Sequence, residues 1–70
     1  MRYGIVIEKT AAGYGAYVPD LPGCAATANT EAEVIAAIRE GIEIDISELK
    51  ARGKHVPSPI SKCTEIEVAV

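Results

Sequence analysis

The chain opens with an alternation of apolar and other residues. From Arg2 to Lys9 one face of an extended backbone carries large apolar side chains, namely Tyr3, Ile5 and Ile7. This two-residue period, rich in Ile and Val, predicts a strand that is apolar enough to be covered on both faces. Gly13 then supplies a hairpin connection, and the alternation resumes from Tyr14 to Val18. We therefore expect two antiparallel strands.

The segment from Tyr17 to Cys24 contains the strongest turn signals in the chain. Pro19 and Pro22 each fix φ and lack a backbone donor, and Gly23 can adopt a positive φ. These residues predict a rigid corner that leads into a third strand of small residues, Cys24 to Ala28. The corner is either an ordinary turn or a feature that shapes a surface for a partner.

A helix is predicted to begin after Thr30, because Thr30 and Glu33 have the spacing of a capping box. An apolar stripe follows at steps of three and four residues: Val34, Ile35, Ile38, Ile42, Ile46 and Leu49. Gly41 costs a helix about 1 kcal/mol relative to Ala, and Ile42 to Ile46 also alternates like a strand. We favour one helix that ends near Arg52, with Gly53 at its C′ position and with Pro57 and Pro59 beyond.

The last segment, Thr64 to Val70, alternates again and predicts a half-solvated strand. The element order is then β-β-β-α-β. Because crossover connections between parallel strands are right-handed, the fourth strand is expected beside the first. The sequence thus predicts an α+β fold with a four-stranded sheet in the order 3-2-1-4 and one helix packed on one face.

Size and charge narrow the possible partners. With 70 residues, 49% of them hydrophobic, the chain is expected to form one domain, 1–70. The core of so small a domain contributes only ~3–5 kcal/mol of stability, so self-association is expected. The formal net charge is -3, and the helix from Glu31 to Lys50 carries six carboxylates against two cations. This acidity argues against direct nucleic-acid binding. An acidic helix face either contacts a basic protein partner or is simply solvated. Ile44 lies off the apolar stripe and is a candidate subunit contact.

Candidate chemistry is sparse. Cys24 and Cys63 match no metal spacing, and buried thiols are expected, although a disulfide stays open. His55 lies in a loop and has no recognisable catalytic partners. Glu8, Glu65 and Glu67 are the only strand carboxylates for a divergent metal-dependent nuclease, a minor alternative, and Asp20 falls in the corner. No cofactor motif is present, so no catalytic, cofactor or metal residue is assigned and an enzyme is not expected.

Four blocks of residues, in order along nearly the whole chain, resemble the N-terminal domain of the HicB antitoxin family. They are the start Met1 to Lys9, the segment Gly15 to Cys24 with its Pro-Asp-Leu-Pro-Gly-Cys sequence, the helix start Asn29 to Glu33, and the exit Arg52 to Pro59. The Pro-Asp-Leu-Pro-Gly-Cys block is the most specific of these.

The resemblance implies a partial RNase H-like fold without the catalytic carboxylates of the nuclease. It also implies a HicA-like toxin as partner, a small basic mRNA interferase whose catalytic histidine is masked, and a homo-oligomer, either dimer or tetramer. No residue is assigned to the toxin contact. The alternative is an orphan homo-oligomeric scaffold domain with no toxin partner.

Two further expectations concern location and DNA. No apolar run approaches the ~18 residues of a membrane span, and the N-terminus meets charge too early for a signal peptide, so a cytoplasmic protein is expected. Many HicB antitoxins continue into a DNA-binding segment after the last strand. Since this sequence stops at Val70, no separate DNA-binding domain is expected.

Overall fold

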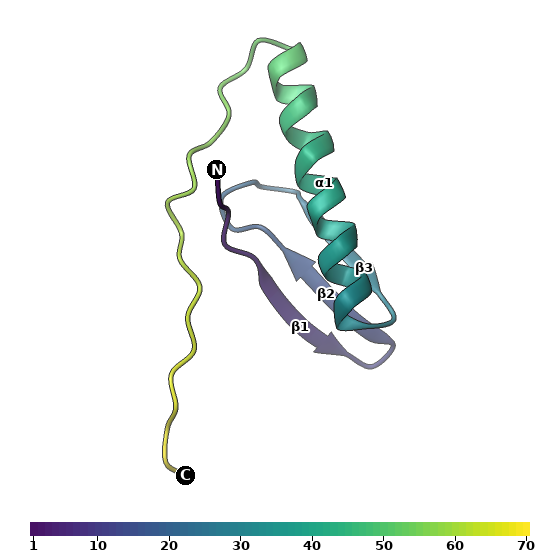
Figure 1. Ribbon diagram of the computed structural model, residues 1–70, viewed down its shortest axis with the longest axis vertical. Coiled ribbons are helices and arrows are strands. Elements are labelled where there is room, and N and C mark those ends of the chain that lie inside the picture. The colour runs from purple at the N-terminus through teal and green to yellow at the C-terminus, as the bar shows by residue number, and fades with distance from the viewer.

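Three strands and one helix make up the regular structure of the chain, as the computed structural model of residues 1–70 shows (Figure 1). The strands are β1 (Val6–Thr10), β2 (Gly13–Tyr17) and β3 (Ala25–Ala28), and the helix is α1 (Glu31–Ala51). The strands form one antiparallel sheet in the order β1-β2-β3. Helix α1 packs against β2 and β3, so the chain is an α+β protein with one covered sheet face.

The predicted hairpin is confirmed, with a shorter first strand and a second strand that begins one residue earlier. Val6 lies opposite Tyr17 and Thr10 opposite Gly13, so the turn between β1 and β2 contains two residues. We expected β1 to begin at Arg2, but it begins at Val6 because β2 ends at Tyr17. The next residue, Val18, donates its N–H to the carbonyl of Cys24 across the corner, at 3.1 Å, and does not extend the ladder.

Helix α1 is a single element that continues through Gly41, as predicted. The Thr30 hydroxyl accepts a hydrogen bond from the Glu33 N–H at 3.1 Å, which caps the first turn. The second bond of the expected capping box differs: the Thr30 hydroxyl lies 2.9 Å from a carboxylate oxygen of Glu33 and donates to it. At the other end, Gly53 has a φ of 66° and Lys54 donates to the Leu49 carbonyl, which terminates the helix in a Schellman motif.

The hydrophobic core is small and lies between the sheet and the first half of α1. Its six buried residues are Ala16, Val18, Leu21, Cys24, Val34 and Ile38. Three of these, Val18, Leu21 and Cys24, belong to the corner between β2 and β3. The second half of α1 contributes no fully buried side chain. The sheet face away from α1 is uncovered, and Tyr17 on it is exposed, so the expectation that β1 is covered on both faces is wrong.

The expected fourth strand does not form in the structure. Residues Thr64 to Val70 have no strand structure, and no backbone-to-backbone hydrogen bond involves any residue beyond Lys54. The segment runs instead as an extended chain past the N-terminus and away from the sheet (Figure 1). Alternation makes a segment suitable for a strand, but a strand also needs hydrogen bonds to a neighbour. The outer edge of β1, where the fourth strand was expected, has no such partner in the structure.

Candidate partner-binding surfaces

The corner between β2 and β3 consists of two successive β-turns. Leu21 donates its N–H to the Val18 carbonyl at 3.1 Å, and Cys24 donates to the Leu21 carbonyl at 3.0 Å. Each turn has proline at its second position, and Gly23, with a φ of 84°, takes the position that demands a positive φ in a type II turn. The geometry turns Leu21 inward, where its side chain is fully buried.

The same corner holds the C-terminal segment through Asp20. One carboxylate oxygen of Asp20 accepts the backbone N–H of Ser61 at 2.9 Å, and the other accepts the Ser61 hydroxyl at 2.7 Å. These bonds lower the pKa of Asp20 below its ordinary value. The bond from the Ser61 backbone has the larger effect and the bond from the Ser61 hydroxyl the next largest. We call this pair the Asp20–Ser61 clasp. Asp20 therefore has a structural role, because it links the corner to the C-terminal segment.

Two more contacts fix where the C-terminal segment lies. The Tyr3 hydroxyl donates a hydrogen bond to the Pro57 carbonyl. Further along, Gly4 faces the segment so closely that an added Cβ would lie 3.1 Å from the Ser61 carbonyl oxygen and 3.2 Å from the Cys63 sulfur. Glycine at position 4 thus permits the segment to pass directly beside the start of β1.

Beyond this contact a cleft separates β1 from the C-terminal segment. Its volume is about 1020 Å³, and its walls include Ile5, Val6 and Ile7 on one side and Lys62, Cys63, Thr64 and Glu65 on the other. Both walls are extended backbones, and neither makes backbone hydrogen bonds across the cleft. We call this space the edge cleft.

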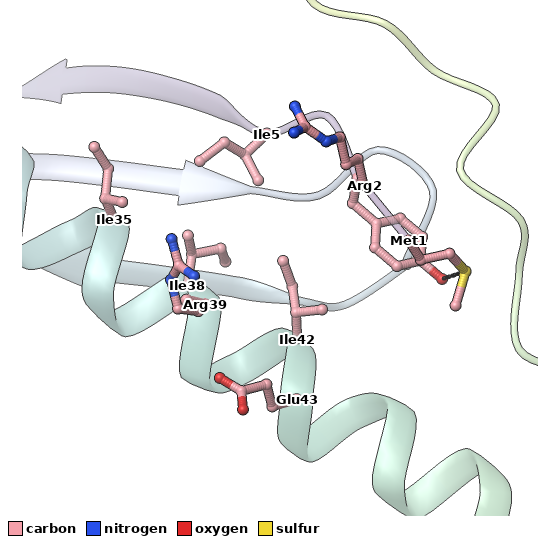
Figure 2. Close-up of a pocket in the computed structure, with 9 residues that line it drawn as sticks. Met1, Arg2, Ile5, Ile35, Ile38, Arg39, Ile42 and Glu43 are labelled. Carbon is pink, nitrogen blue, oxygen red and sulfur yellow. Dashed lines mark hydrogen bonds between the residues drawn. The ribbon is translucent and has the colours of Figure 1, made fainter.

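An apolar groove of about 690 Å³ runs between the N-terminal residues and α1 (Figure 2). Ile5 faces Ile35, Ile38 and Ile42 of the helix across it, while Arg2, Arg39 and Glu43 are charged residues of its lining. The groove exists because α1 lies over β2 and β3 and leaves the helix side of β1 partly uncovered. We call it the helix groove.

The outward face of α1 is acidic. Glu40, Glu43 and Glu48 line a shallow surface depression together with Ile44 and Ser47. Ile44 is 52% exposed, as its position off the apolar stripe predicts. A single apolar side chain surrounded by carboxylates is the kind of surface that contacts a basic partner protein.

The predicted candidates for chemistry are dispersed. Glu8, Glu65 and Glu67 are all exposed, His55 is exposed, and no group of three or more His, Cys, Asp or Glu residues is arranged to hold a metal ion. Both cysteines are free, so the structure contains no disulfide. Cys24 is buried, as expected. The pKa of its thiol is raised, mainly by burial and to a smaller extent by the negative charge of Asp45. Cys63 is exposed, which corrects the expectation of two buried thiols.

The surfaces described above belong to a small α+β domain with two open grooves and one charged helix. No helix in the structure has the length and apolarity that a membrane span requires. The family model of the HicB-like antitoxin of bacterial toxin-antitoxin systems matches residues 3–69. The chain belongs to this family, and its resemblance to HicB antitoxins is confirmed.

Individual relatives agree with this assignment. UPF0150 protein Ta0767 of Thermoplasma acidophilum is 36% identical over 58 residues, which are 81% of this chain and 84% of the relative. A UPF0150 protein of Helicobacter pylori is 39% identical over 51 residues, covering 73% and 71% of the two chains. A chain of the solved HicA3 and HicB3 toxin-antitoxin complex matches with a TM-score of 0.73 and 35% identity, over 86% of this chain and 70% of that one.

Proposed function

We propose that the chain is an antitoxin that binds a HicA-like toxin, a small basic mRNA interferase, and neutralises it by covering its active site. The observation that carries this proposal is the likeness, at a TM-score of 0.73 and 35% identity, to a chain from a HicA3 and HicB3 complex. Membership of an antitoxin family supports the same conclusion. The proposed role requires binding and no chemistry by the antitoxin itself.

The acidic outward face of α1 is the proposed toxin contact. Carboxylates at Glu40, Glu43 and Glu48 would attract a basic toxin, which chiefly speeds encounter and selects the partner. Ile44, exposed among them, would contribute apolar contact area at the centre of the interface. Glu8 is an exposed carboxylate on β1, outside this face of α1, so a substitution there is a suitable control.

The test is co-expression of the chain with each neighbouring reading frame that encodes a small basic protein, followed by a growth assay and a pull-down. We expect one such protein to arrest growth alone and to be neutralised and captured by this chain. The double substitution Glu40→Lys with Glu43→Lys should slow association about tenfold, whereas Glu8→Lys should not. Absence of any captured and neutralised partner would contradict the antitoxin role.

The remaining parts of the proposal concern the oligomeric state, the cellular location and nucleic-acid binding. We propose a homo-oligomeric, cytoplasmic protein in which 1–70 acts as one HicB-like domain and binds no nucleic acid directly. A fourth strand beside β1, which would complete the partial RNase H-like fold, is expected to form in the assembled state. The exposed apolar side chains of the C-terminal segment favour this view.

The second candidate function is an orphan scaffold domain whose partner is another copy of itself. The specific observation in its favour is the set of large apolar residues exposed beyond the helix: Ile60, Ile66, Val68 and Val70. Light scattering at micromolar concentration tests it, because a purely monomeric chain would exclude a scaffold. A captured toxin would favour the antitoxin role over the scaffold.

A further inference from the structure

The C-terminal segment Lys62–Val70 has the properties of a strand that lacks its sheet. Ile66, Val68 and Val70 are 81%, 69% and 119% exposed, and they alternate with Glu65, Glu67 and Ala69. No residue of the segment takes part in a backbone-to-backbone hydrogen bond. An extended segment with one apolar face is not stable alone in water, and it needs both an edge to pair with and a surface to cover that face.

The close approach at Gly4 indicates which way Cys63, near the start of the segment, faces. The Cys63 sulfur lies 3.2 Å from the position of a Cβ at Gly4, so Cys63 and Gly4 are directed to the same side of the sheet. Gly4 shares that side with Val6 and Glu8, and it is opposite to Ile5 and Ile7, which pack against the core.

Alternation carries this assignment along the segment. If the segment pairs as a strand, Glu65 and Glu67 would share the side of Cys63, the sheet face that no helix covers. In such a strand, Ile66, Val68 and Val70 would be directed to the helix side. A half-solvated strand in this orientation has its polar and apolar faces on the correct sides of the sheet.

Pairing of the segment with β1 of its own chain would leave these apolar residues uncovered. Helix α1 packs over β2 and β3, and the helix groove beside Ile5 is already partly open. A strand placed outside β1 would lie still farther from α1. Closure within one chain would therefore satisfy the edge of β1 but leave Ile66, Val68 and Val70 without an apolar row on their outer side, which the same segment of a second copy can provide.

We propose that a second copy of the chain supplies this cover through reciprocal exchange of Lys62–Val70, a proposal that deepens the self-association stated above and does not depend on the toxin. The segment of one copy enters the edge cleft of the other, between β1 and that copy's own C-terminal segment. The cleft, about 1020 Å³ in volume, lies between the unpaired edge of β1 and the unpaired C-terminal segment, and an inserted strand could form backbone hydrogen bonds with both of them.

A two-fold axis between the two C-terminal segments makes the exchange symmetric. Within one chain the segment follows the general direction of β1 (Figure 1), so the segment of the second copy runs antiparallel to β1 of the first. The two sheets join through the two central segments, and both helices lie on the same face. Ile66, Val68 and Val70 of both copies then fill the space between the two helix grooves, beside Ile5 and Ile42.

The Asp20–Ser61 clasp gives the exchange a fixed starting point. It holds the chain at Ser61, immediately before the exchanged segment, and the Tyr3 bond to Pro57 holds it once more upstream. The segment therefore leaves each copy at the edge of β1 with a defined direction. Holding the strand in this way reduces the conformational entropy that is lost on pairing.

The first experiment compares two substitutions to lysine at adjacent positions on opposite faces. Ile66→Lys places a charge in the proposed apolar interface, while Glu67→Lys places the same side chain on the solvated face. In light scattering on the full chain without toxin, we expect the wild type and Glu67→Lys to be dimeric. Ile66→Lys should raise the dimer dissociation constant about a hundredfold while helix content by circular dichroism is retained. A monomeric wild type, or equal effects of the two substitutions, would overturn the proposal.

The second experiment separates exchange from a dimer whose segments pair within their own chains. A dimer assembled from equal amounts of ¹³C-labelled and ¹⁵N-labelled chains permits detection of nuclear Overhauser effects between copies only. We expect such effects between the methyl groups of Ile66 or Val68 and the amides of β1. Effects confined within one chain would overturn the exchange. Since no toxin is present, either result leaves the antitoxin role to be judged by its own assay.

Discussion

The corner between β2 and β3 and the C-terminal segment are similar in length and opposite in structure. In the corner, Val18, Leu21 and Cys24 are buried, and three backbone hydrogen bonds close its turns. In the segment Lys62–Val70 every residue is exposed and no backbone hydrogen bond forms. The corner is closed by hydrogen bonds within one chain, whereas the segment has no backbone hydrogen bond within the chain.

The two regions meet at one point, the Asp20–Ser61 clasp. The rigid corner supplies a carboxylate, and the unpaired segment supplies the N–H and hydroxyl that bind it. The corner thus has two functions: it anchors the core through Leu21, and it determines where the segment leaves the molecule. The following predictions test this division, from the largest expected effect to the smallest.

Leu21→Ala should have the largest effect on stability. Leu21 is 1% exposed, and truncation of a buried leucine lowers the free energy of unfolding by about 2–5 kcal/mol. Because a domain of this size has little more stability than that, much of the protein should be unfolded at room temperature. Urea denaturation followed by circular dichroism measures the effect. Ile66→Ala is the control, and at concentrations where the chain is monomeric it should change stability by less than about 0.5 kcal/mol.

Gly23→Ala should destabilise the corner by strain alone. Nothing lies within 4 Å of an added Cβ at this position, so no clash is introduced. The φ of 84° remains, and a side chain there costs about 1–2 kcal/mol. The same denaturation assay should show a corresponding loss. An unchanged midpoint would mean that the second turn can adopt another conformation without disturbing the core.

Most of the fold was predictable where the determining interactions are local. Thr30 and Gly53 defined the ends of α1, and Pro19, Pro22 and Gly23 defined the corner. The fourth strand was not found in the structure, because alternation from Thr64 to Val70 specifies the faces of a strand but not its neighbour. Likewise, no local pattern indicated that Asp20 would bind Ser61, since their 41-residue separation is bridged only by the tertiary fold.

Gly41→Ala should stabilise the protein. Gly41 lies within α1, and an added Cβ would lie 3.8 Å from the Cys24 sulfur, an ordinary van der Waals contact. Replacing a helical glycine by alanine without a clash should raise the free energy of unfolding by about 0.5–1 kcal/mol. A higher urea midpoint with an unchanged slope would confirm it. Destabilisation would show that the sulfur of Cys24 cannot accommodate the methyl group.

The smallest effect on global stability, and the one most specific to the clasp, should come from protonation of Asp20. Its pKa is lowered from an ordinary value of 3.8, so the clasp contributes fully above that value. The contribution is lost as the pH falls from about 4 through the lower pKa of the folded state. The ¹⁵N relaxation of the Ser61 amide should report increased local motion over this range. Asp20→Asn retains an acceptor for that amide but cannot titrate, so its Ser61 relaxation should not change with pH. If the wild type and Asp20→Asn respond to acid alike, another group controls the segment, and the corner does not determine where the segment leaves the molecule.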